Sequence, residues 1–149
     1  MAGRTLIAQI SEQALAAGVL ETLLQILAPT NIRLKIKSWG VFFDGIVVTE
    51  APVQVELLRQ TGAGTSSALT LVSLESAYAE IIQSSALQSF TAEPTAGSIL
   101  ASKEVHPQGG YEIIRPLGDE IPVPGAGRVG IRATAPSAVN ARAFIEFEE

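Results

Sequence analysis

His106 is the one histidine in this 149-residue chain, and histidine is the side chain best suited to transfer protons near neutral pH. It precedes the turn-forming segment 107–110, Pro-Gln-Gly-Gly. A catalytic histidine needs a carboxylate or a nucleophile beside it in space, and the candidates are Asp44, Asp119 and scattered glutamates. No nucleophile-elbow motif accompanies them. We therefore expect His106 to end a strand and to bond to loop backbone, and we expect the protein not to be an enzyme.

The segment Gly125–Gly130 matches the dinucleotide-binding pattern G-x-G-x-x-G letter for letter. The chemistry of that pattern needs a strand before it and a helix after it, because the helix N-terminus holds the pyrophosphate. Here Pro122 and Pro124 interrupt the preceding segment, and residues 129–134 alternate like a strand. We interpret the segment as a loop that leads into a strand, so the sequence predicts no nucleotide cofactor.

Metal-ligating residues are scarce. The chain has no cysteine, one histidine and two aspartates, Asp44 and Asp119, which lie far apart in the sequence. Transition metals need several Cys or His ligands, and calcium sites draw on clustered carboxylates. The sequence thus predicts no metal and no other cofactor. It also argues against a small cupin-like enzyme, because cupin metal chemistry needs several histidines.

Arg33, Lys35 and Lys37 form the densest basic feature of an acidic chain. By the two-residue repeat of a strand they share one face. Two interpretations are open. The face could be solvated, with its charges paired to acids such as Glu56 on a neighbouring strand, or it could dock onto an acidic protein. The three glutamates in residues 146–149 could also pair with basic faces, within the chain or between subunits.

An aromatic cluster, Trp39, Phe42 and Phe43, lies beside the turn at 44–45. Aromatic rings at one end of a sandwich can stack on sugars. Core packing is the competing interpretation, since aromatic residues make up 5% of the chain and these few are needed inside.

The amino-acid composition and charge exclude some classes of binding partner. The chain is 47% hydrophobic and 17% charged, with a net charge of −5 and a pI of about 4.9. Nucleic-acid binding normally needs a basic stripe, so no nucleic acid is expected. No apolar run reaches the roughly 18 residues of a membrane span, and residues 1–10 lack a secretory pattern, so we expect no membrane and cytoplasmic assembly. The excess of apolar residues has two explanations: a well-filled core, or a surface that another chain covers. The second explanation leads us to expect a homo-oligomer.

Alternating apolar and polar residues, with turn clusters at intervals of roughly 8–12 residues, are typical of a β-sandwich. The clearest case is Ile32–Phe43, whose first half alternates strictly. We predict an all-β, two-sheet jelly-roll sandwich of about eight strands. The expected strands are 23–27, 32–43, 53–57, 69–74, 81–90, 99–106, 111–117, 128–134 and 138–147.

The first residues differ from the rest. We expect an N-terminal arm over 1–21, either extended or with a short strand at 5–10 and a short helix at 11–18, ahead of a sandwich domain over 22–149. Its apolar side chains need cover that another subunit could supply, so they join the basic strand as candidate interaction residues. The full candidate set is Arg33, Lys35, Lys37, Leu6, Ile7 and Ile10.

Four segments carry a resemblance to a known class of protein: 27–31, 105–111, 124–131 and the strand-like ending 144–149. In their strands and turn positions they resemble the small jelly-roll decoration, or cement, proteins that coat the heads of tailed phages. The similarity extends over 22–149 and includes no catalytic or ligand motif.

The resemblance implies a structural virion protein that binds the outer capsid surface, stabilises the shell and is assembled in the host cytoplasm. Its implied partners are the major capsid protein and further copies of itself, as a homotrimer. The alternative function is a carbohydrate- or receptor-binding sandwich of a phage tail or a secreted system. It would need exposed aromatic rings or a Ca²⁺ site with clustered aspartates, and the two distant aspartates argue against the Ca²⁺ site.

Overall fold

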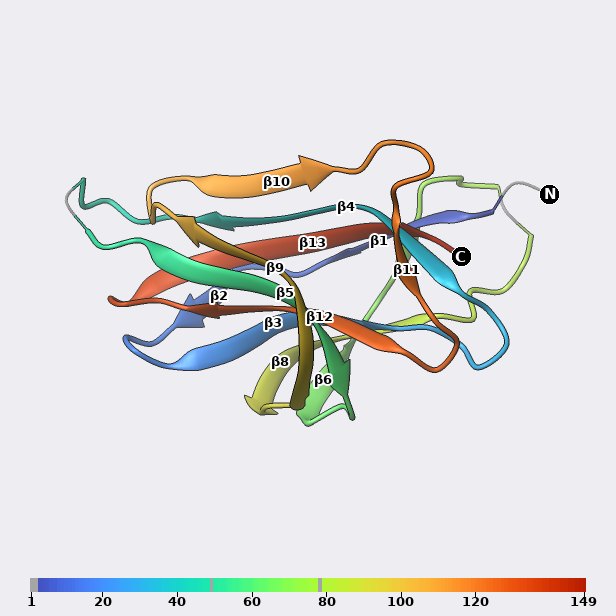
Figure 1. Ribbon diagram of the computed structural model, residues 1–149, viewed down its shortest axis with the longest axis horizontal. Helices are drawn as coiled ribbons and strands as arrows, with labels where there is room; N and C mark the ends of the chain where they lie inside the picture. Colours follow the sequence, from blue (N-terminus) through green and yellow to red (C-terminus); the bar gives the residue numbers. More distant parts are fainter. Residues whose placement is uncertain (1–2, 49, 78) are drawn as a thin grey trace.

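Two antiparallel sheets pack face to face and enclose the core (Figure 1). The computed structural model describes residues 3–48, 50–77 and 79–149. Within these residues there are thirteen strands and no helix. The predicted all-β, two-sheet sandwich is therefore confirmed. The strands outnumber the expected eight because four of them lie wholly or almost wholly outside the segments expected to form the strands of the sandwich: Thr5–Gln9, Gln13–Leu15, Thr65–Leu69 and Ile121–Val123.

The first sheet has seven strands. Its main path runs β10-β4-β13-β1-β7, while β11 pairs with β4 beside β10, and β2 pairs with β13 beside β1. The bounds are β10 (Gly110–Ile114), β4 (Leu34–Phe43), β13 (Val139–Glu148), β1 (Thr5–Gln9), β7 (Val72–Ser73), β11 (Ile121–Val123) and β2 (Gln13–Leu15).

The second sheet has six strands in the order β6-β8-β3-β12-β5-β9. The bounds are β6 (Thr65–Leu69), β8 (Ser85–Ala92), β3 (Leu20–Leu27), β12 (Arg128–Thr134), β5 (Val53–Thr61) and β9 (Thr95–Val105). Of the predicted strands, 128–134 has the observed bounds, and 53–57, 99–106 and 138–147 lie on observed strands whose ends differ by a few residues.

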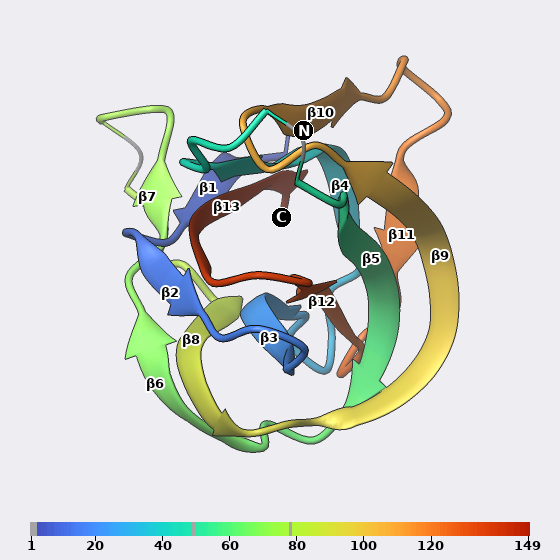
Figure 2. The ribbon, with the colours of Figure 1, turned by 90° about the vertical axis from the view of Figure 1, so that its left-hand side faces the viewer.

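Four strands of the second sheet make one long two-stranded ribbon. Residues 62–64 join β5 to β6, residues 93–94 join β8 to β9, and β5 pairs with β9 as β6 pairs with β8. Figure 2 shows the ribbon curving around β3 and β12. At the joint Gly64 has φ +57°, and a Cβ there would lie 2.1 Å from the Ala92 carbonyl oxygen, so only glycine fits.

Polar side chains are buried where the ribbon bends around β3. Gln25 donates to the Gln60 side-chain oxygen at 2.9 Å, and Gln60 donates to the Thr22 hydroxyl at 3.0 Å. Arg128 donates to the Gln25 oxygen at 2.7 Å, and the Thr22 amide donates to Glu93 at 2.8 Å. An unsatisfied buried polar group costs about 1–3 kcal/mol, so this closed network fixes the ribbon against β3 and β12.

The main core lies between the sheets. β13 buries every second residue from Val139 to Phe147, and β4 contributes Ile36, Trp39 and Val41. Trp39 is 1% exposed and its ring lies 5.4 Å from that of Tyr111. The predicted core role of Trp39 is therefore confirmed.

The N-terminal segment differs from the expected arm. β1 pairs along its whole length with β13, from Thr5 opposite Glu148 to Gln9 opposite Phe144, and β2 pairs with the start of β13. Residues 11–18 form no helix; they contain β2. The sequence allows a strand at 5–10, but it does not show that the strand belongs to the sandwich, because its partner β13 is at the far end of the chain. Met1 and Ala2 lie outside the described residues.

Leu6→Ala tests whether β1 belongs to the core. Leu6 is 0% exposed, so the substitution should lower the free energy of unfolding by about 2–5 kcal/mol. Gln9→Ala, on the exposed side of the same strand, should change it by no more than about 0.5 kcal/mol. Urea denaturation measures both. Equal effects of the two substitutions would mean that β1 is a dispensable arm.

Gln25→Leu tests the buried network. The variant leaves the Gln60 oxygen and the Arg128 guanidinium without their partner, so unfolding should become easier by about 1–3 kcal/mol. The control is Gln54→Leu on the exposed face of β5, whose single hydrogen bond to Glu56 is at 3.2 Å. A Gln25→Leu protein as stable as the control would contradict a structural role for the network.

Candidate functional site

The loop between β4 and β5 presents three successive apolar side chains at one end of the sandwich, the left-hand end in Figure 1. Ile46 is 87% exposed, Val47 48% and Val48 74%. Single exposed apolar residues are normal on a protein surface, but a contiguous group of them marks an interaction site. The C-terminus and the start of β1 lie at the opposite end (Figure 1).

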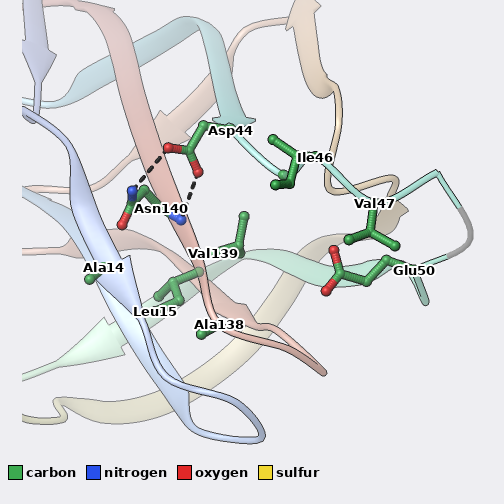
Figure 3. Close-up of a pocket in the computed structure, with 10 residues that line it drawn as sticks. Ala14, Leu15, Asp44, Ile46, Val47, Glu50, Ala138, Val139 and Asn140 are labelled. Atoms are coloured by element: carbon green, nitrogen blue, oxygen red, sulfur yellow. Dashed lines mark hydrogen bonds between the residues drawn. The ribbon is translucent and has the colours of Figure 1, made fainter.

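The loop is held at both sides of its tip. The Asp44 carboxylate accepts hydrogen bonds from the Asn140 amide at 3.0 Å and from its side chain at 2.9 Å (Figure 3). The Gly45 amide donates to the Pro107 carbonyl at 2.7 Å. The His106 ring nitrogen Nε2 lies 3.0 Å from the Val48 carbonyl oxygen. These hydrogen bonds connect the described residues on both sides of the tip to Asn140, Pro107 and His106.

His106 thus has the role predicted from the sequence. Its ring bonds to loop backbone on both sides, since Nδ1 accepts from the Gln108 amide at 3.1 Å while Nε2 contacts the Val48 carbonyl. No group of three or more His, Cys, Asp or Glu residues that could hold a metal occurs among the described residues.

A cavity of about 320 Å³ lies under the loop (Figure 3). Its lining is apolar on most sides, with the Asp44 and Glu50 carboxylates from the loop itself; the apolar part is Ala14, Leu15, Ile46, Val47, Ala138 and Val139. The hydrogen bonds from Asn140 lower the pKa of Asp44 below its ordinary value of 3.8. The loop therefore keeps a negative charge beside its apolar tip at neutral pH.

A second hollow, of about 250 Å³, lies on one side of the sandwich between β9 and the β10–β11 edge of the first sheet. Trp39 forms part of its lining, together with Leu100, Tyr111, Ile113 and Ile121. We call this hollow the lateral groove. Its two cations are Lys103, whose ammonium lies 5.5 Å from the centre of the Tyr111 ring, and Arg115, which is paired with Asp119 at 3.2 Å.

The basic strand is partly neutralised by the C-terminal strand. Lys37 forms an ion pair with Glu148 at 3.0 Å and donates to the Thr5 hydroxyl at 3.0 Å. The expected pairing with a C-terminal glutamate within the chain is confirmed for Lys37. Arg33 and Lys35 are exposed.

Two other acids, Glu56 and Glu120, were candidates to balance the charge of the basic strand or lie close to it. Glu56, the partner suggested by the sequence, is instead paired with Arg132 on β12. The pKa of Glu120 is lowered by backbone hydrogen bonds within residues 118–120 and, to a smaller extent, by the charges of Lys35 and Lys37. The paired interpretation therefore holds for Lys37, whereas a docking role for the exposed Arg33 and Lys35 stays a prediction.

The apolar candidates of the N-terminal segment are largely unavailable to a partner. Leu6 is 0% exposed and Ile10 3%, because both face the core. Ile7 is half-buried on the outer face, paired with Glu146 on one side and Val72 on the other. These apolar side chains were expected to be covered by another subunit, but β13 and the second sheet of the same chain cover them.

The described aromatic residues do not form a sugar-stacking platform. Phe42 is 40% exposed, but its ring stacks on Phe144 at 6.3 Å between centroids, and Phe43 is 9% exposed. Tyr78 lies outside the described residues. The carbohydrate-binding alternative therefore gains no support from this part of the chain.

The glycine-rich segment is a loop and a strand, as the sequence predicted. The Gly127 amide donates to the Pro124 carbonyl at 2.8 Å, and β12 begins at Arg128. Without a following helix there is no dipole to hold a pyrophosphate. The described residues also contain no helix capable of crossing a membrane.

Sequence reasoning missed the loop tip and the lateral groove. The run Ile46-Val47-Val48 between an Asp-Gly turn and Glu50 was the available signal for the loop. The groove has no comparable signal, because its walls come from strands that are brought together by the packing of the two sheets.

No family model matches the chain, and no curated protein matches it. Two similar solved structures are the infectious bursal disease virus Gx strain (15% identity, TM-score 0.27) and the VP2 subviral particle of infectious bursal disease virus (16% identity, TM-score 0.25). Each match covers 99% of this chain and 42% of the other, so the chain spans less than half the length of those proteins. A likeness of this size identifies neither a family nor a function.

Asp44→Ala tests the tether of the loop. A carboxyl with a lowered folded-state pKa stabilises the fold fully above its ordinary pKa and loses that contribution as pH falls through the lowered value. The variant should melt at a lower temperature than the wild type at neutral pH, and the gap should narrow as the pH falls below the ordinary pKa of 3.8 and through the lowered value. Glu104→Ala, at an exposed position of β9, should show no such gap. A pH-independent gap for Asp44→Ala would contradict the tether.

Proposed function

We propose that the protein is a structural virion protein that decorates the outer surface of a capsid and stabilises the shell through added contacts. Its partners in this proposal are the major capsid protein and further copies of itself in a homotrimer. The observation that carries the proposal is the tethered apolar loop tip, Ile46, Val47 and Val48, which a free monomer leaves in water.

The energetics favour contact over solvation. Full burial of one such aliphatic side chain is worth about 1.5–3 kcal/mol, so a loop that buries three of them could contribute several kcal/mol per contact. Contacts that exist only in the assembled shell stabilise that shell by mass action, and many identical copies add their effects. This role requires no catalytic step, and no enzymatic activity is proposed.

Two measurements test the proposal. Light scattering of the purified protein should give three times the mass of one chain. Immunogold labelling of intact particles from the source should place the protein on their outer surface without breaking them. Particles that lack the protein, or label only after disruption, would contradict a decoration role whatever the oligomeric state.

A further inference from the structure

We propose that the apolar loop tip of one copy occupies the lateral groove of a second copy, so that identical chains join head to tail. The inference rests on the proposed homo-oligomer and adds the two surfaces that form it. The loop is the 44–50 segment tipped by Ile46, Val47 and Val48, and the groove is the hollow between β9 and the β10–β11 edge.

The two surfaces match in apolar character. The loop brings aliphatic side chains that are 87%, 48% and 74% exposed. The groove brings the partly exposed side chains of Leu100, Tyr111 and Ile113, beneath which the buried Trp39 forms the floor. Both are pre-formed, because the loop is tethered to Asn140 and His106, and the groove lies between paired strands. Pre-formed surfaces lose little conformational entropy when they meet.

They also match in charge. The loop carries two carboxylates, Asp44 and Glu50, beside its tip. The nine residues that line the groove include two cations, Lys103 and Arg115, and no acid. Arg115 is already paired with Asp119, whereas the exposed Lys103 contacts the Tyr111 ring. Copies with a net charge of −5 repel one another on average, so a specific contact needs this kind of local complementarity.

Strand pairing can add to the contact. β9 is the outer strand of its sheet, and its residues 100–103 line the groove. The outer edge of such a strand offers backbone donors and acceptors to an incoming segment. A loop that enters the groove would therefore meet hydrogen-bonding groups as well as apolar side chains.

The positions of the two surfaces dictate a head-to-tail contact. The loop is at one end of the sandwich (Figure 1), and the residues that line the groove include none of the loop, so the two are different patches of one chain. A contact between two different patches leaves one loop and one groove free in every pair. Such contacts form a closed ring where the rotation between copies divides a full turn, and open filaments otherwise; a homotrimer requires the closed ring.

Ile46→Asp and Leu100→Glu test the loop and the groove separately. Each places a charge in the apolar contact, so each should weaken self-association at least about tenfold, measured by sedimentation velocity over a concentration series. The matched control is Ile81→Asp, at a side chain that is also 87% exposed but lies outside both surfaces. Circular dichroism and thermal melts confirm that each variant is folded.

Two further experiments test the same contact: mixing the two variants, and exchanging the charges of Glu50 and Lys103. An equimolar mixture of Ile46→Asp and Leu100→Glu copies has one intact loop–groove contact per pair, so it should form two-copy species and no closed ring. Glu50→Lys and Lys103→Glu should each weaken association, and the double variant should restore it.

Each contrary result has a distinct meaning. A monomeric wild-type protein, or an oligomer that survives Ile46→Asp and Leu100→Glu unchanged, would overturn the inference. The proposed decoration role is decided independently by the labelling of intact particles.

Discussion

The pairing of β13 between β1 and β4 is the interaction on which the rest of the structure depends. It joins the two ends of the chain in the middle of one sheet and buries every second residue of β13. It also positions the polar contacts outside the core. Asn140 at its start holds Asp44 and so the apolar loop, and Glu148 at its end neutralises Lys37. A loss of this pairing would release the N-terminal strands, the basic strand and the loop together.

Local patterns predicted the strands better than their partners. The alternation in β4, β5, β12 and β13 located these strands, because one face of each is turned to the core. β11 was missed because Pro122 lies within it, and Pro is depleted in strands. β1 was assigned to an arm because its partner is at the other end of the sequence, and alternation contains no information on which strands pair. Register, too, is set by packing: Glu56 meets Arg132, and Lys37 meets Glu148.

The same distinction between local patterns and packing applies to the candidate site. The role of His106 followed from its place before a turn, a property of adjacent residues. The tether between Asp44 and Asn140 joins residues on two strands far apart in the chain, and no local pattern indicates it. The lateral groove exists only because β9 and the β10–β11 edge belong to different sheets that do not close on each other. Features made by one segment were predictable, and features made by the packing of two sheets were not.

The rigidity of the apolar loop determines how much free energy its docking can release. Fixing a flexible residue costs about 1–2 kcal/mol, which is close to the gain of about 1.5–3 kcal/mol from burying one aliphatic side chain. A mobile loop would therefore gain little on docking, because the ordering cost would offset the burial. Here the hydrogen bonds from Asn140 to Asp44 and between His106 and the Val48 carbonyl form within the folded chain, so they offset part of that cost before any docking. The central β13 strand thus supports the interaction surface as well as the core, since the residue that holds the loop belongs to it.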